Sequence, residues 1–133
     1  MTNVQLETGE NGSINNKKYD LKERIFEYVI EVIDYLDKLP RSSVNKVIVG
    51  QCTRSVTSIG ANYEEADGAH TKRDFCYKME QIRKETKETR YWLKISHRKN
   101  PSILPTMCQK LQDEGQELIR IFSSIINKTR DKE

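Results

Sequence analysis

The sequence predicts an all-α fold, an antiparallel up-down-up-down four-helix bundle, and three observations support this prediction. The chain has 133 residues, enough for one domain with a single core. Apolar residues make up 35% and charged residues 32%, with only three prolines and six glycines, which is typical of amphipathic helices. Four segments repeat apolar residues at helical spacing, and the short connections between them favour antiparallel neighbours.

The first helix is predicted to follow a polar tail. Residues 1–18 show no periodicity, so we expect them to be disordered. Asp20 and Glu23 have the spacing of a capping box, which predicts a helix start at Asp20, and Pro40 should stop the helix. Its core stripe is expected to comprise Phe26, Val29, Ile33 and Leu36, widened by Ile25, Val32 and Leu39.

The second helix should begin after Ser42 or Ser43 as N-cap and end near Ala66, with Gly68 as its C-terminal breaker. Its apolar face comprises Ile48, Cys52, Val56, Ile59, Tyr63 and Ala66.

The third helix is predicted from Lys72 to about Ser96, because Thr71 and Asp74 resemble a cap. It should bury Phe75, Met79, Ile82, Thr86, Thr89 and Leu93. Pro105 suits the first turn of a fourth helix, with a stripe of Cys108, Leu111, Gly115, Leu118, Phe122 and Ile125. The bundle domain is therefore expected over residues 19–128, followed by a charged end at 129–133.

Small and polar residues share one side of the second predicted helix. Steps of four, three, four and three residues place Gln51, Ser55, Ser58, Asn62 and Glu65 on that side. If the second and third helices fold back near residue 70, facing residues have numbers that sum to about 140. The predicted pairs are then Arg54 with Glu85 or Glu88, and Lys78 with Asn62 or Glu65. We call these residues the polar seam: Arg54, Ser55, Ser58, Asn62, Glu65, Lys78, Glu85 and Glu88.

Positive charge is concentrated on the third helix. Residues 70–99 carry ten cationic and four anionic side chains, 10 − 4 = +6, whereas the whole chain carries +3. Arg83, Lys87, Arg90 and Lys94 form one basic row along it. The row is either a solvated, salt-bridged face or a surface that contacts the phosphates of RNA or DNA.

No catalytic or metal-binding motif stands out. His70 and His97 are predicted near opposite ends of the third helix, and no phosphate-binding loop or exposed nucleophile motif occurs. The three cysteines, Cys52, Cys76 and Cys108, fall in or beside apolar stripes, as expected of core residues in a reducing compartment. We therefore expect a cytoplasmic protein that is not an enzyme, with no cofactor, metal, small-molecule substrate or membrane association.

Tyr91, Trp92 and Leu93 are consecutive, so they cannot all face one core. Either Tyr91 or Trp92 lies at a helix margin, where a large aromatic side chain can anchor another protein. Core packing against the first helix is the alternative.

Four linked motifs resemble the small bacterial four-helix-bundle proteins named after reading frames in intervening sequences of 23S ribosomal RNA genes. The motifs are RSVTSIGANYEEADGA, KRDFCYKM, KETKETRYWL and ELIRIFSSII, and the resemblance spans about Tyr19 to Lys128. The chain departs from the pattern Asn-Ile-Ala-Glu-Gly, where it has Asn62-Tyr63-Glu64-Glu65-Ala66. The larger Tyr63 is expected to change local packing and not the fold.

The resemblance implies a left-handed bundle without catalytic activity that assembles as a ring-shaped homopentamer. It also implies a distant relation to the accessory variability protein of diversity-generating retroelements, a basic pentameric bundle associated with nucleic acid. The first functional interpretation is thus a self-associating interaction or scaffold module. The alternative is a nucleic-acid-binding accessory protein that uses the basic row.

Overall fold

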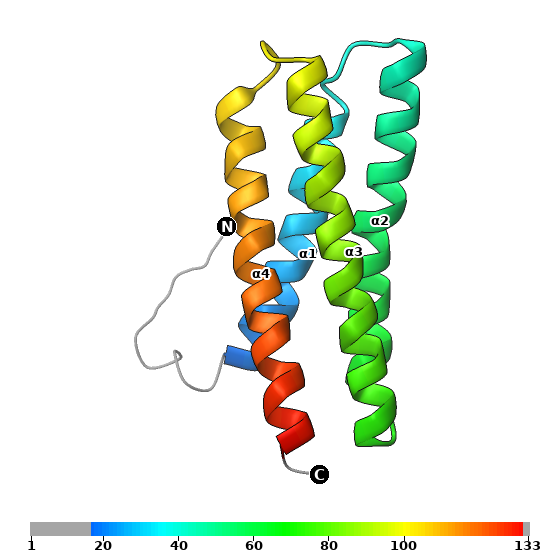
Figure 1. The fold of residues 1–133 in the computed structure, drawn as a ribbon, viewed down its shortest axis with the longest axis vertical. Helices are drawn as coiled ribbons and strands as arrows, with labels where there is room; N and C mark the ends of the chain where they lie inside the picture. The colour runs from blue at the N-terminus through cyan, green and yellow to red at the C-terminus, as the bar shows by residue number, and fades with distance from the viewer. Residues whose placement is uncertain (1–16, 132–133) are drawn as a thin grey trace.

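The structure, a computed structural model, describes residues 17–131 and consists there of four helices. They are α1 (Lys17–Leu36), α2 (Ser43–Asp67), α3 (Lys72–Lys99) and α4 (Pro105–Asp131). Consecutive helices run in opposite directions (Figure 1). Helix α3 packs closely against both α2 and α4, whereas α1 approaches α2 and α4 less closely. No strand occurs within residues 17–131, which confirms the predicted all-α class.

Helix α1 begins at Lys17, so the predicted start at Asp20 is wrong by three residues. Residues 17 and 18 of the predicted polar tail belong to this helix, and residues 1–16 lie outside the part of the chain that the structure describes. The helix ends at Leu36, before Pro40, and a turn follows in which the Leu39 amide donates to the Leu36 carbonyl (3.1 Å).

The buried face of α1 differs from the predicted stripe at Phe26. Its side chain is 59% exposed, whereas Tyr28 and Tyr35, which the prediction omitted, are 1% exposed. Both tyrosines lie on the same helix face as Ile25 and Val32, and this face points into the bundle. Phe26 lies about one hundred degrees away, because it is the next residue along the helix. Counting tyrosine as a core residue would have given the correct face.

Helices α2 and α3 begin at the predicted caps. The Ser42 hydroxyl accepts from the Asn45 amide and the Thr71 hydroxyl accepts from the Asp74 amide, both at 3.0 Å. Gly68 follows α2, and its amide donates to the Glu65 carbonyl (3.1 Å). The predicted apolar face of α2 is buried at every position, Ile48, Cys52, Val56, Ile59, Tyr63 and Ala66.

Helices α3 and α4 both extend beyond their predicted ends. Helix α3 reaches Lys99, three residues past Ser96. Helix α4 begins at Pro105, as predicted, and continues to Asp131. Residues 129–131 of the expected charged end are therefore helical, and residues 132–133 lie outside the described chain.

One core fills the centre of the bundle and receives side chains from all four helices. All three cysteines are buried and unbonded, and burial raises the pKa of the Cys52 thiol to about 12. This thiol is therefore a packing group. No helix in the described residues is long and apolar enough to cross a membrane.

Candidate interaction surfaces

The centre of the polar seam is a buried pair of hydroxyl groups. Ser55 on α2 and Thr89 on α3 are both fully buried, and their oxygens lie 2.7 Å apart. Ser55 is also within hydrogen-bonding distance of the Cys52 carbonyl (3.1 Å), and Thr89 of the Glu85 carbonyl (2.9 Å). These small side chains allow the two helices to approach closely, and neither of these two hydroxyls is left without a partner.

Ion pairs lie on both sides of this centre. Arg54 of α2 lies 3.4 Å from the Glu85 carboxylate and forms a closer ion pair with Glu88. Glu88 also accepts from the Trp92 indole N–H (3.1 Å). The hydrogen bond from Arg54 is the main cause that lowers the pKa of Glu88 below its usual value.

Toward the connection between α2 and α3, Lys78 bridges two residues of α2. Its ammonium lies 3.5 Å from the Asn62 side-chain oxygen and forms an ion pair with Glu65. Ser58, between Arg54 and Asn62 on the same helix face, is half-buried. The structure thus places the predicted partners of the polar seam together.

A further polar contact joins α2 and α3 at the opposite end. The side chains of Asn45 and Asn100 exchange two hydrogen bonds of 2.9 and 3.0 Å, and Asn45 also donates to the Pro40 carbonyl (2.7 Å). Sequence reasoning missed this pair, although its numbers sum to 145, near the register expected for facing residues.

The basic row is divided by the structure. Arg83 donates to the Ser123 hydroxyl (3.0 Å) and Arg90 donates to the Gln112 carbonyl (2.7 Å), so both bind α4. Lys87 and Lys94 are exposed. Arg83 and Arg90 are half-buried between packed helices, and each guanidinium donates to an oxygen atom of α4. The four residues therefore do not form one free cationic face.

Gly115 explains how α4 accommodates Arg90. A Cβ atom at this position would lie 2.7 Å from the Tyr28 hydroxyl oxygen and 2.8 Å from Arg90 Cγ. Tyr28 is buried, its hydroxyl has no hydrogen-bond partner among the described residues, and burial raises its pKa. Glycine therefore lets side chains from α1 and α3 converge on α4.

Tyr91 and Trp92 occupy different environments. Tyr91 is 59% exposed, whereas Trp92 is half-buried against the core. Their ring centroids lie 5.8 Å apart in an edge-to-face arrangement. Of the two, only Tyr91 offers a large free surface.

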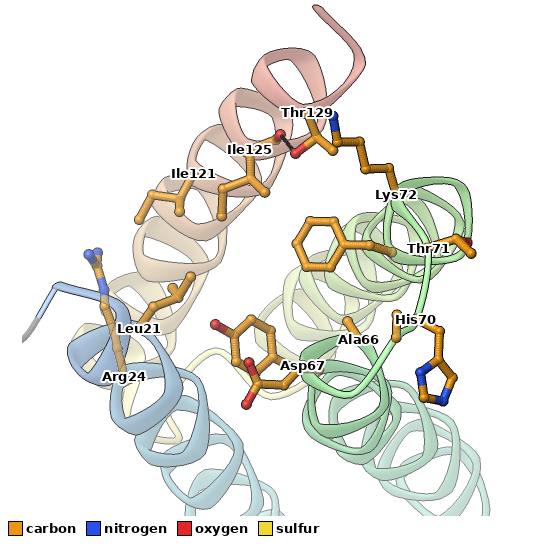
Figure 2. A pocket seen from close by; sticks show the side chains of 13 residues that line it. Leu21, Arg24, Ala66, Asp67, His70, Thr71, Lys72, Ile121, Ile125 and Thr129 are labelled. Carbon is orange, nitrogen blue, oxygen red and sulfur yellow. Dashed lines mark hydrogen bonds between the residues drawn. The ribbon is translucent and has the colours of Figure 1, made fainter. Parts of the chain in front are cut away.

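A cleft of about 960 Å³ opens at the end of the bundle where the beginning of α1 and the last turns of α4 lie beside the α2–α3 connection (Figure 2). Leu21, Ile121 and Ile125 face into it, whereas the His70 ring points away. The bidentate Arg24–Glu114 ion pair (2.6 and 2.8 Å) shows which residues of the antiparallel helices α1 and α4 face each other. In this register, the first described residue of α1 lies level with about Ile121.

Large apolar side chains are exposed on the outer face of α1, beside α2. Phe26 and Ile30 are 59% and 38% exposed on successive turns of α1. Phe26 borders a groove of about 290 Å³ that is also lined by Thr57, Gly60 and Ala61 of α2. This face combines a protruding aromatic ring with a shallow surface of small residues.

The two histidines lie far apart in the described part of the chain. His70 follows α2 and His97 lies in the last turn of α3, at opposite ends of that helix. No group of three or more histidine, cysteine, aspartate or glutamate side chains within residues 17–131 is arranged to hold a metal ion.

Comparisons with known proteins place this geometry in a family. No curated protein matches the chain. A solved structure from Bacteroides thetaiotaomicron, a protein of unknown function from the S23 ribosomal protein family, is 30% identical with a TM-score of 0.72. The similarity covers 80% of this chain and 97% of that chain. Residues 17–124 match the family described as 23S rRNA-intervening sequence protein. The chain therefore belongs to the 23S rRNA-intervening sequence protein family.

Proposed function

We propose that this protein is a non-catalytic interaction module that self-associates through the outer face of α1 and α2, with a homopentamer as the favoured assembly. The observation that carries the proposal is the exposure of Phe26 and Ile30 beside Gly60 and Ala61. An exposed aromatic side chain next to small residues can insert into the same face region of another copy. The number five comes from the family resemblance.

The energetics of this face favour association. Fully burying a phenylalanine side chain stabilises by about 1.5–3 kcal/mol relative to leaving it in water. Large aromatic side chains also supply much of the binding energy of protein interfaces. Lys22 and Glu64, which also line the groove, form an ion pair across it (3.3 Å). The surface therefore combines an apolar centre with a charged edge, as interfaces commonly do.

One observation supports the non-catalytic part of the proposal. Serine, arginine and glutamate side chains of the polar seam are bound to one another between α2 and α3, so they form a packing contact. The polar groups that a catalyst would need are thus used to join helices.

Light scattering coupled to size exclusion tests the proposal. The wild-type protein should have several times the mass of the 15.6 kDa chain, whereas Phe26→Glu should be monomeric with unchanged helicity. Met107→Glu is the matched control, because Met107 is also exposed (40%) but lies on α4. A monomeric wild type, or a Phe26→Glu variant of unchanged mass, contradicts the proposal. Tyr91→Ala shows whether the predicted contact at Tyr91 contributes.

A further inference from the structure

We infer that the outward face of α3 binds single-stranded nucleic acid. Five residues, spaced by three, four, three and four positions, form what we call the α3 strip: Lys84, Lys87, Tyr91, Lys94 and Arg98. This spacing keeps them on one side of the helix, and all five are exposed. The strip shares only Lys87 and Lys94 with the predicted basic row, and the inference does not depend on self-association.

The carboxylates of α3 do not neutralise the strip. Arg54 from α2 forms ion pairs with Glu85 and Glu88, and Arg130 from α4 forms an ion pair with Glu80. The remaining acidic residue of the helix, Asp74, lies in its first turn. Three of the four anions are thus paired with arginines from neighbouring helices. The four cations of the α3 strip are left to face solvent.

None of the four strip cations makes an ion pair with another described residue. Lys84 lies near enough to Glu88 to favour the ionised carboxylate, although the two do not form an ion pair. By contrast, Arg83 and Arg90 on the same helix are hydrogen-bonded to α4. Exposed, unpaired cations in a line produce a positive potential that attracts phosphates.

The dimensions and the aromatic residue suit an extended strand. Lys84 and Arg98 are fourteen positions apart, so the strip is about 21 Å long at the rise of an α-helix. Tyr91 lies at its middle with its ring 59% exposed. A base can stack on such a ring while lysines on either side contact phosphates. This combination matches the chemistry of single-stranded RNA or DNA.

The packing of α3 disfavours duplex recognition. A helix reads duplex DNA by entering a major groove about 12 Å wide. Helix α3 is packed closely against α2 on one side and α4 on the other, so it does not protrude from the bundle. Stacking on Tyr91 also requires a base that is not paired within a duplex. A single strand that lies across the face of α3 does not require a protruding helix, and its bases are not paired within a duplex.

Fluorescence anisotropy tests the inference with four labelled probes: 15-nucleotide oligo(U), 15-nucleotide oligo(dT), and 15-base-pair RNA and DNA duplexes. The single strands should bind more tightly than the duplexes, and the two single-stranded probes separate RNA from DNA. If four cations contact phosphates, affinity should fall about 50-fold between 50 and 200 mM salt. No binding at 50 mM salt, or tighter binding to the duplexes, would overturn the inference.

Variants locate the binding on the strip. The double variant Lys87→Glu and Lys94→Glu should bind at least about tenfold more weakly and show a shallower salt dependence. Tyr91→Ala should weaken binding about tenfold and leave the salt dependence unchanged. Lys38→Glu with Lys46→Glu is the matched control, because both lysines are exposed on other parts of the bundle. Equal losses in the control would show a net-charge effect and overturn the inference.

Two further measurements guard against indirect effects. Light scattering on each variant shows whether a loss of binding reflects altered assembly, and circular dichroism shows whether the bundle is intact. In a variant with unchanged mass and helicity, weaker binding supports the α3 strip as the nucleic-acid-binding site. Unchanged affinity in both the lysine and the Tyr91 variants excludes the α3 strip as that site.

Discussion

The contact between α2 and α3 differs in kind from the contacts that α1 makes with α2 and α4. The α2–α3 contact is close and has small hydroxyl side chains at its centre, Ser55 and Thr89, with ion pairs on both sides. Helix α1 lies farther from its neighbours and fills the space with large side chains such as Tyr28 and Tyr35. The α2–α3 contact depends on small side chains and paired polar groups, whereas the contacts of α1 depend on the volume of large side chains.

The difference shows two ways to fix the position of a helix. In the α2–α3 contact, hydrogen bonds and ion pairs at particular positions determine which residues face each other, because a shift would leave buried polar groups unpaired. In α1, the volume of the aromatic side chains determines the fit. The two contacts should therefore fail under opposite changes, enlargement in the first case and truncation in the second.

The largest expected effect is truncation in α1. Tyr35→Ala should lower the free energy of unfolding by about 3–5 kcal/mol, because Tyr35 is 1% exposed and its removal leaves a cavity. Tyr35→Phe should lose only about 1 kcal/mol, since it removes one hydrogen bond to Ser96 (2.9 Å) and keeps the ring. Urea unfolding followed by circular dichroism measures both. Equal losses would show that volume does not determine the fit of α1.

Enlargement at the centre of the polar seam should have the next largest effect. Ser55→Leu should destabilise by about 1–3 kcal/mol, because the fully buried site has no room for the added carbons. Gln51→Leu, at an exposed position on the same helix and outside the groove beside Phe26, is the control and should change stability by less than about 0.5 kcal/mol. Thermal unfolding compares the two. A Ser55→Leu variant as stable as the control would refute the size requirement.

The Arg54–Glu88 ion pair should contribute less. A double-mutant cycle with Arg54→Ala and Glu88→Gln should give a coupling energy of about 0.5–1 kcal/mol, because both side chains are partly exposed to solvent. The coupling should decrease in 1 M salt, which screens exposed charges. Additive single and double variants, with no measurable coupling, would mean that this pair does not contribute to register.

Acid should remove the stabilisation that the Arg54–Glu88 ion pair provides. The pKa of Glu88 is lower in the folded chain than in the unfolded chain, so the folded state binds fewer protons. The stabilisation is complete above about pH 4.3 and is lost as the pH falls through the folded pKa. The stability difference between wild type and Arg54→Ala, below about 1 kcal/mol at pH 7, should therefore shrink by pH 3. Urea midpoints at several pH values test this, and a difference that widens in acid would contradict it.

Local signals in the sequence predicted much of the fold. The cap Thr71 was identified, and Ser42 was one of two candidates for the other cap, because cap chemistry involves neighbouring residues. The pairs of Arg54 and Lys78 followed from antiparallel register alone, since a short connection fixes which residues face each other. The apolar face of α2 was correct because its repeat is unambiguous.

Other features could not be read from local signals. The exposure of Phe26 depends on which of two overlapping apolar stripes of α1 meets the core, and the buried tyrosines decide it. The orientation of Arg83 and Arg90 depends on where α4 places Ser123, the Gln112 carbonyl and Gly115. Such long-range partners are set by tertiary packing, so the sequence did not show that Arg83 and Arg90 of the basic row bind α4, and the α3 strip was not predicted.

The ion pairs of Arg54 and Arg130 have a consequence for α3 studied as a peptide. In an isolated helix, Glu80 and Glu88 each lie four residues from Lys84, a spacing at which opposite charges attract. In the bundle both carboxylates are bound instead to arginines of other helices. A synthetic α3 peptide would thus partly mask Lys84, and only the complete bundle would leave Lys84 without an ion-pair partner.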